Sequence, residues 1–160
     1  MLEKLLKTDC RYVLEFHSDF SDIDTEKLGL LIKVAFGTSL VKGYFAQEPI
    51  KVVLLESFHR AAAIILPYQG WDYLDKFVVH PLLQTNGVGS EIFHQVMAVD
   101  KVFWRVDQRK PCLQWYFDKV PQYDLHSASA GKWILFWKGQ SSAPTVLEYA
   151  EHKRETLEEV

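Results

Sequence analysis

A turn with two glycines, Gln84–Ser90, is the clearest candidate for chemistry in the sequence, and its spacing is Q-x-x-G-x-G. Glycines in such a turn let backbone amides approach a ligand without interference from a Cβ atom. A helix that follows the turn adds unpaired N–H groups and the positive end of its dipole. This combination favours an anion such as the pyrophosphate of a nucleotide-like cofactor, although a turn of this length can also serve backbone geometry alone.

The turn is positioned by a strand before it and a helix after it. The apolar run that ends at Val79 and is bounded by Pro81 predicts a strand over 73–79. Beyond the turn, apolar residues recur at the spacing of a helix. They are Ile92, Phe93, Val96, Met97 and Val99.

The other residue types that often do chemistry form no recognisable site. The six histidines are scattered, without HExxH or paired spacing, so no metal is expected. His80, at the end of the 73–79 strand, is expected to have a structural role. Cys10 and Cys112 lack metal-ligand spacing, and we expect them to be free thiols of a cytoplasmic protein.

Composition limits the classes of protein that this chain can represent. Its 160 residues suffice for one domain with a substantial core, and 48% of them are hydrophobic. A net charge of −3 gives no sign of a nucleic-acid binder. No apolar run approaches the roughly 18 to 20 residues of a membrane span. Neither nucleic acid nor a membrane is therefore an expected partner.

The rest of the chain alternates strand and helix patterns. Asp22 or Asp24 is expected to cap the first helix, and Gly37 to end it. The order predicts an α/β fold with helices on a mixed sheet, and it differs from the strict alternation of a Rossmann sheet. The expected strands lie at 11–16, 50–56, 60–66, 101–105 and 131–138, and the helices at 28–36, 39–47, 114–119 and 145–159.

Five motifs in sequence order resemble those of one family. They are YLDKFVV at 73–79, the Q-x-x-G-x-G turn, FWR at 103–105, WYF at 115–117 and KW-x-x-FW-x-G at 132–139. Together they resemble the acetyltransferase domain of vertebrate-type N-acetylglutamate synthases, which is also half of some bacterial synthase/kinases. The resemblance covers about 11–139, and it implies the GNAT fold, a mixed central sheet flanked by helices.

The resemblance implies that an acetyl group passes from acetyl-CoA to the α-amine of L-glutamate, giving N-acetyl-L-glutamate for arginine biosynthesis. A backbone N–H near Val78 or Val79 would polarise the thioester carbonyl. Water would take the proton of the amine, and Tyr116 would protonate the leaving thiolate. No metal is needed. The cofactor-binding candidates are Phe77, Val78, Val79, Gln84, Thr85, Asn86, Gly87, Val88, Gly89 and Ser90.

Two cations match the substrate-binding positions of the family. Lys76 and Arg105 are expected on adjacent strands, and from the residues alone both would be ordinary exposed charges. The resemblance implies that they bind the carboxylates of glutamate, with Tyr116 beside them.

The sequence departs from the family pattern on the glutamate side. Asp107 and Lys110 stand where W-R-x-R-x-x-N has its second arginine and its asparagine, and Thr38 stands where F-G-K has a lysine. An acid beside a dicarboxylate would repel it, and Arg109 or Lys110 would have to compensate.

The expected organisation is an acetyltransferase domain over 1–140 and a helical tail over 141–160. The amino-acid kinase domain that normally precedes such a domain lies outside this sequence. It is an expected fused partner, and we also expect a homo-oligomer. Two alternatives stay open. One is a weakly catalytic regulatory or assembly domain of an acetylglutamate kinase, and the other is a GNAT enzyme with another amine acceptor.

Overall fold

The computed structural model describes residues 14–48, 51–55, 60–84, 87–140 and 143–158. A seven-stranded sheet in the order β1-β2-β3-β4-β5-β7-β6 forms its centre. Its neighbouring strands are antiparallel, except that β4 and β5 run parallel. The expected mixed sheet is therefore confirmed. The strands are β1 Leu14–His17, β2 Lys51–Leu55, β3 Ala61–Tyr68, β4 Trp71–Val79, β5 Val102–Asp107, β6 His126–Ala130 and β7 Trp133–Lys138.

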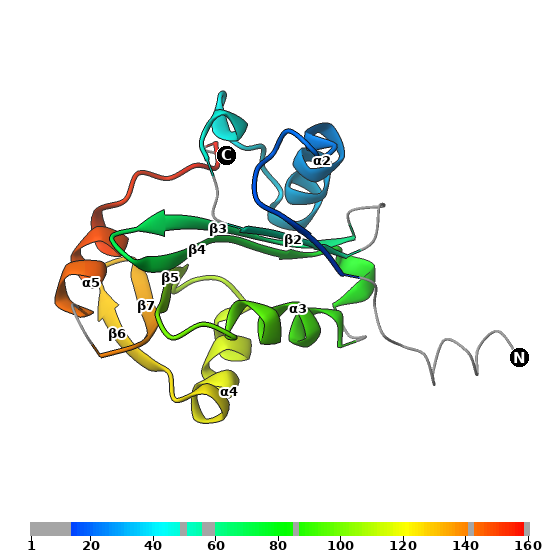
Figure 1. The fold of residues 1–160 in the computed structure, drawn as a ribbon. Helices are drawn as coiled ribbons and strands as arrows, with labels where there is room; N and C mark the ends of the chain where they lie inside the picture. Colours follow the sequence, from blue (N-terminus) through cyan, green and yellow to red (C-terminus); the bar gives the residue numbers. More distant parts are fainter. Residues whose placement is uncertain (1–13, 49–50, 56–59, 85–86, 141–142, 159–160) are drawn as a thin grey trace, which may run out of the picture.

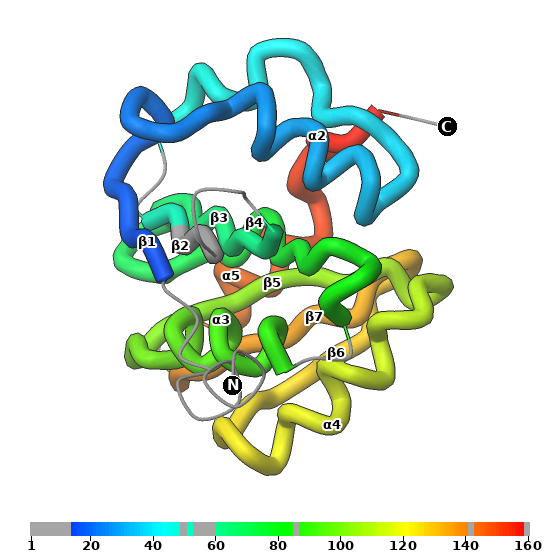
Figure 2. The backbone as a smooth tube through the Cα atoms, turned by 90° about the vertical axis from the view of Figure 1, so that its right-hand side faces the viewer, coloured from blue at the N-terminus to red at the C-terminus, as the bar shows by residue number. Residues whose placement is uncertain are grey.

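Helices cover both faces of this sheet and give it two cores. One core holds the buried side chains of α2 and α5, and the other holds those of α3 and α4. Figures 1 and 2 show α2 on one side of the sheet and α3 and α4 on the other. The helices are α2 Thr25–Phe36, α3 Val88–Val96, α4 Leu113–Tyr123 and α5 Ala143–His152, with short 3₁₀ helices η1 Tyr44–Ala46 and η2 Pro81–Leu83.

Helix α2 begins and ends where the sequence predicts. The side chain of Asp24 accepts a hydrogen bond from the backbone of Lys27, which satisfies one of the unpaired N–H groups of the first turn. Gly37 ends the helix in the left-handed conformation, with φ of 75°. The strands expected over 50–56 and 60–66 also form, as β2 and β3, and they pair antiparallel.

The prediction of a helix over 39–47 is wrong. Only the 3₁₀ turn η1 forms there, directly after Gly43, whose φ is 80°. The backbone before it is used elsewhere, because Ser39 and Val41 bond to the C-terminal segment of the chain. Helical propensity is a weak prior that such tertiary contacts override.

The second half differs in the extents of its elements. Helix α4 is longer than expected and runs to Tyr123, and β6 forms in the stretch 122–130, for which a loop or a short strand was expected. The C-terminal helix, expected over 145–159, ends at His152. Its end is fixed by Arg105, whose guanidinium donates to the carbonyls of Ala150 and Lys153. A cation that satisfies the last carbonyls of a helix stabilises its end at that point.

Candidate active site

The central parallel strands β4 and β5 pair over a short stretch and then stop. Their register joins Asp72 to Val102 and Tyr73 to Phe103. In the described residues no pair follows, although both strands continue. A register irregularity where β3 meets β4 leaves Asp75 without a directly opposite residue. Backbone groups beyond this point can therefore bond to a ligand instead of a neighbouring strand.

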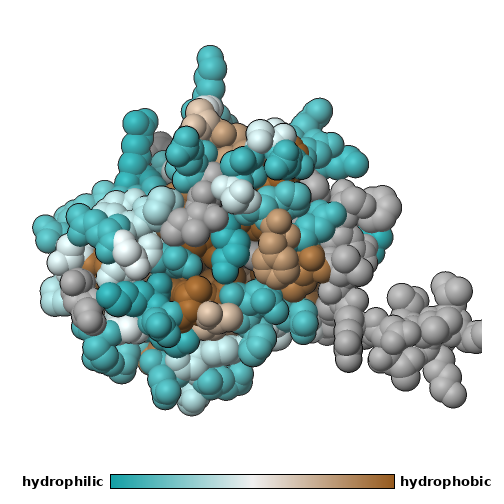
Figure 3. Space-filling view, in the orientation of Figure 1, coloured by the Kyte–Doolittle hydropathy of each residue, from teal (hydrophilic) through white to brown (hydrophobic). Residues whose placement is uncertain are grey.

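Three cofactor candidates, Phe77, Val78 and Val79, lie on this unpaired part of β4. Their other edge pairs with β3. On the face drawn in Figure 3, apolar side chains are exposed near the middle, where Figure 1 shows β5 above α4, and hydrophilic side chains surround them. An apolar hollow with a polar rim suits a partly hydrophobic ligand.

The glycine turn leads directly into α3, as the sequence predicts. Gln84 follows η2, and its side-chain amide donates to the carbonyl of Val79 at 3.3 Å. Gly87 stands at the N-cap of α3 with φ of 77° and supplies no side-chain cap. The first N–H groups of α3 are thus left for another acceptor. Thr85 and Asn86 lie outside the described residues.

A lysine that sequence reasoning missed lies beside this helix start. Lys119 of α4 donates from Nζ to the hydroxyl oxygen of Ser90 at 3.0 Å. Gly89 lies next to β4, since a Cβ there would be in van der Waals contact with Val79 Cγ2 at 3.4 Å. A cation next to a helix N-terminus strengthens an anion site. Sequence spacing gave no signal for Lys119, because the contact joins two helices.

The candidate proton donor, Tyr116, lies in an aromatic cluster on the α3 and α4 side of the sheet. Its ring packs against those of Phe93, Trp104 and Phe136. Burial raises the pKa of its hydroxyl, which therefore stays protonated at neutral pH. The neighbouring Trp104 indole N–H is buried and lacks a hydrogen-bond partner within the described chain. A bound polar group would be stabilised beside it.

Lys76 lies on the opposite face of the sheet from Tyr116, the face that α2 covers. Its side chain is only 7% exposed. Nζ bonds to Asp75 Oδ2 at 3.1 Å, to the Asp75 carbonyl at 3.2 Å and to Thr156 Oγ1 at 2.6 Å. Asp75 also accepts from the hydroxyl of Tyr44 and lies 3.9 Å from Lys153 Nζ. Burial lowers the pKa of Lys76, and Asp75 opposes this shift.

Arg105 lies on the same face as Lys76, one strand away. Its Nη1 donates to the carbonyls of Ala150, at 3.1 Å, and Lys153. Its guanidinium stacks 4.0 Å from the ring centre of Trp133. The structure therefore has the two candidate substrate cations on adjacent strands, as expected. It also places them on one face and gives both of them partners from the C-terminal segment.

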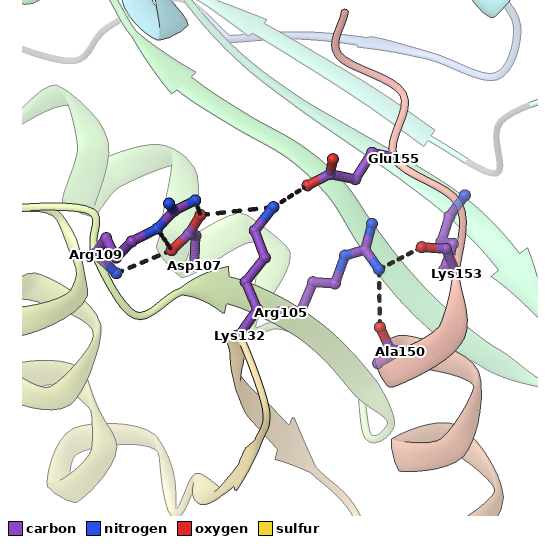
Figure 4. A network of polar contacts seen from close by, with 7 residues as sticks. All are labelled: Arg105, Asp107, Arg109, Lys132, Ala150, Lys153 and Glu155. Carbon is purple, nitrogen blue, oxygen red and sulfur yellow. Dashed lines mark hydrogen bonds and ion pairs between the residues drawn. The ribbon is translucent and has the colours of Figure 1, made fainter. Parts of the chain in front are cut away.

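Asp107 does not stand as an unpaired charge beside these cations. Arg109 donates to both of its carboxylate oxygens, from Nε at 3.1 Å and from Nη2 at 2.8 Å. Lys132 Nζ lies 3.8 Å from Asp107 and 2.6 Å from Glu155 (Figure 4). The negative charge that would repel a dicarboxylate is thus balanced by Arg109. The side chain of Lys110 makes no hydrogen bond or ion pair among the described residues, although its backbone bonds to Asp107.

This pairing predicts a pH-dependent contribution to stability. Hydrogen bonding from Arg109 lowers the pKa of Asp107 to about 2. Because the folded pKa lies below the unfolded value of about 3.9, the contribution is complete above about pH 4 and is lost as pH falls through 2. We expect Asp107→Asn to lower the free energy of unfolding at pH 7, and about half of that difference to remain at pH 3. Urea unfolding at both pH values measures it.

The exposed Asp118→Asn on α4 is the matched control for this titration. An Asp107→Asn difference that is the same at pH 7 and pH 3 would contradict the role of Arg109.

His80 has the structural role that was expected. Its Nδ1 accepts from the backbone N–H of Leu82 and so caps η2. The described residues contain no group of three or more His, Cys, Asp or Glu that could hold a metal ion. None of the described helices is long and apolar enough to cross a membrane.

Comparison with known families gives a match over most of the chain. Residues 15–156 match the N-acetyltransferase domain of N-acetylglutamate synthase. The mitochondrial N-acetylglutamate synthase of Danio rerio is 33% identical over 141 residues, which are 84% of this chain and 26% of that protein. The acetylglutamate kinase of Xylella fastidiosa (strain 9a5c) is 27% identical over 122 residues, 75% of this chain and 28% of that one. The chain thus spans about a quarter of the length of these relatives.

Solved structures confirm the GNAT fold. The ribosomal-protein-S18-alanine N-acetyltransferase of Escherichia coli superposes with a TM-score of 0.61 at 12% identity, over 82% of this chain and 97% of that chain. A GNAT-family protein of Bacteroides thetaiotaomicron gives a TM-score of 0.64 at 12% identity, over 87% and 94% of the two chains. At such identity the likeness concerns the fold alone.

Proposed function

This chain belongs to the family of N-acetyltransferase domains of N-acetylglutamate synthase, and from this premise we propose that it transfers the acetyl group of acetyl-CoA to the α-amine of L-glutamate. The observation that carries the proposal is the pair of cations on one face of β4 and β5. Lys76 and Arg105 lie where these strands stop pairing, with the glycine turn and α3 at the end of β4. A dicarboxylate needs two fixed cations, and an acetyl donor needs the neighbouring unpaired backbone.

Acetyl-CoA would be held by the groups around the glycine turn. The first N–H groups of α3 and the Lys119 ammonium would bind its pyrophosphate, and the free edge of β4 would bind its pantetheine arm. The backbone N–H of Val79 points away from β3, because alternate residues bond to a neighbouring strand and that of His80 bonds to Arg60. This N–H, rather than that of Val78, would stabilise the oxyanion that forms when the amine attacks the thioester carbon. The C–S bond then breaks, and Tyr116 would give its proton to the departing sulfur.

L-Glutamate would approach from the α2 and α5 face. Its two carboxylates would bind the Lys76 ammonium and the Arg105 guanidinium, which would direct the α-amine toward the gap between the strands. Water would take the proton of the ammonium before attack, because only the neutral amine is nucleophilic.

The role of Lys119 predicts a selective loss of acetyl-CoA affinity. We expect Lys119→Met to raise the dissociation constant of acetyl-CoA about fivefold, since a single partly exposed cation near a phosphate contributes on the order of 1 kcal/mol. The KM for glutamate should stay unchanged. Calorimetric titration with acetyl-CoA at low and high salt measures the effect, which salt should weaken.

Lys138→Met is the control for Lys119, because Lys138 is also partly buried but bonds to carbonyls of Met97 and Val99 after α3. An equal loss of affinity in both variants would argue against a specific role for Lys119.

The proposed reaction is tested by the release of CoA thiol from acetyl-CoA. The purified protein is assayed with L-glutamate, D-glutamate, L-aspartate, L-glutamine and a peptide amine. We expect release with L-glutamate, and much less with L-glutamine, which lacks the second carboxylate. Faster release with a non-acidic amine would favour a GNAT enzyme with another acceptor.

A regulatory or assembly domain of an acetylglutamate kinase is the second candidate, and it is favoured by the C-terminal segment, which already bonds to Lys76 and Arg105. The relatives are several times longer than this chain, so we also propose that an amino-acid kinase domain is fused to it in the full-length protein. Binding of acetyl-CoA without release of thiol for any amine would support this second candidate.

A further inference from the structure

The segment Lys153–Glu158, called the strap below, crosses from the end of α5 to the residues that follow α2. Figures 1 and 2 show it running from the sheet to the α2 side. Thr156 accepts a backbone hydrogen bond from Val41 at 2.8 Å, and Glu158 donates one to Ser39 at 2.8 Å. Leu40 and Leu157 face each other as an antiparallel bridge. The strap thus forms an edge-to-edge contact with a segment more than a hundred residues away.

The strap occupies the hydrogen-bonding capacity of Lys76. An ammonium has three donors, and Nζ of Lys76 has three acceptors: Oδ2 and the carbonyl of Asp75, and Oγ1 of Thr156. Two of these come from the residue next to Lys76 on β4. Thr156 is the acceptor that a neighbouring segment brings, so it is the one that a substrate carboxylate would replace.

The same region occupies one nitrogen of Arg105. Nη1 carries two N–H donors, and they bond to the carbonyls of Ala150 and Lys153. These two oxygens take the place of carboxylate oxygens on the guanidinium. The substrate cations proposed above are therefore engaged by the chain itself.

The exposure of the strap favours its movement away from Lys76 and Arg105. None of its residues is buried, and three of them are exposed. Glu155 in the middle of the strap forms an ion pair with Lys132, which directly precedes β7. The two side chains are 45% and 40% exposed, and such exposed ion pairs contribute little to stability in water. Opening separates Leu157 from the α2-side core and Lys153 from Asp75. Because it exposes no fully buried residue of the strap, its free-energy cost lies below that of global unfolding.

We propose that the strap is a gate over the glutamate site: it is closed in this structure, and L-glutamate binds to the state in which the Thr156 hydroxyl has left Lys76 and the Lys153 carbonyl has left Arg105. The proposal rests on the proposed function. With such a gate, the observed affinity for glutamate is the intrinsic affinity of the open state multiplied by the fraction of molecules that are open. Acetyl-CoA, which binds on the other face, binds to open and closed forms alike.

A reversible disulfide across the strap tests the gate. Leu40 and Leu157 are a non-hydrogen-bonded pair of an antiparallel bridge. The backbone hydrogen bonds lie on either side of the pair, from Val41 to Thr156 and from Glu158 to Ser39. The Cα atoms of such pairs lie about 4.5 Å apart, within the range of a disulfide. Leu40→Cys/Leu157→Cys is made in a Cys10→Ser/Cys112→Ser background, and its oxidised and reduced forms are compared. N-acetylglutamate is counted by mass spectrometry, because a reductant interferes with thiol assays.

We expect the oxidised form to have kcat/KM for glutamate at least 20-fold below that of the same protein after reduction. The dissociation constant of acetyl-CoA should agree within twofold between the two forms. Leu157→Cys alone, oxidised in the same background, is the control and should not respond to reductant. Equal kcat/KM in the locked and reduced forms would overturn the gate and leave the proposed function standing. No product from any form, the parent included, would overturn the proposed function and the gate with it.

Thr156→Val gives a second readout that needs no disulfide. Loss of the Thr156 acceptor weakens the closed state only, so we expect KM for glutamate to fall about threefold with kcat unchanged. A KM that rises would mean that Thr156 serves the bound substrate, and it would contradict the gate.

Discussion

Replacing Tyr116 by phenylalanine is expected to lower kcat for glutamate acetylation about 100-fold, the lower end of the range for general acid catalysis. The departing thiolate then has to take its proton from water. The ring of phenylalanine fills the same place among Phe93, Trp104 and Phe136, so the fold and the affinity for acetyl-CoA should persist. Steady-state turnover and calorimetric titration with acetyl-CoA measure the two quantities.

Tyr123→Phe is the matched control, since Tyr123 is a second tyrosine of α4 that also packs against Phe93. Its kcat should stay within twofold of the wild-type value. Should Tyr116→Phe keep full turnover, Tyr116 would be part of the core only, and the thiolate would have another proton donor.

Replacing Lys76 by methionine is expected to lower kcat/KM for glutamate about 100-fold, which corresponds to about 2.7 kcal/mol. Methionine keeps the volume of the chain on β4 but offers no charge to a carboxylate. The dissociation constant of acetyl-CoA should change by less than twofold, because the cofactor groups lie on the other face. The buried Asp75 loses its nearest cation, so a fall in unfolding free energy is also expected. Lys153, 3.9 Å from Asp75, limits that fall.

Lys101→Met controls for the loss of a lysine near the same strands, since Lys101 lies over the ring of Trp71 rather than near Asp75. Glutamate kinetics, acetyl-CoA titration and urea unfolding are measured on both variants. A parallel loss of glutamate use and acetyl-CoA affinity in Lys76→Met would mean that the substitution damages the whole site, and Lys76 would not be a specific substrate ligand.

Local signals explain which parts of the fold could be read from the sequence. Helix α2 carries its own limits, because Asp24 caps it and Gly37 ends it. The strand, glycine turn and helix from β4 to α3 likewise have a contiguous pattern. These elements are stabilised by neighbours in the chain, so a reading of periodicity and capping residues locates them correctly.

The errors occur where distant segments decide the structure. The residues around Val41 do not form the expected helix, because their backbone bonds to the strap. Helix α5 ends at His152 because Arg105 of β5 caps it. The position of Lys119 beside the glycine turn could not be predicted for the same reason, since its contact with Ser90 joins two helices. No local pattern encodes such contacts.

The glutamate side of the site shows the same limit. The sequence placed Lys76 and Arg105 on adjacent strands, and the structure has them there. It gave no sign that their donors are engaged by the C-terminal segment. Asp107 and Thr38, the two departures from the family pattern, also acquire partners that only the fold reveals: Arg109 and Lys132 beside Asp107, and the Glu158 carbonyl beside Thr38.

In the proposed reaction this domain joins an acetyl group to the nitrogen of L-glutamate. The most direct measurement follows acetyl-CoA labelled with ¹³C at the acetyl carbonyl and L-glutamate labelled with ¹⁵N, by NMR, in the presence of the protein. We expect a carbonyl signal split by one-bond coupling to ¹⁵N, which only an amide between the two labels can give. Labelled acetate, or acetyl-CoA that stays unchanged, would contradict it.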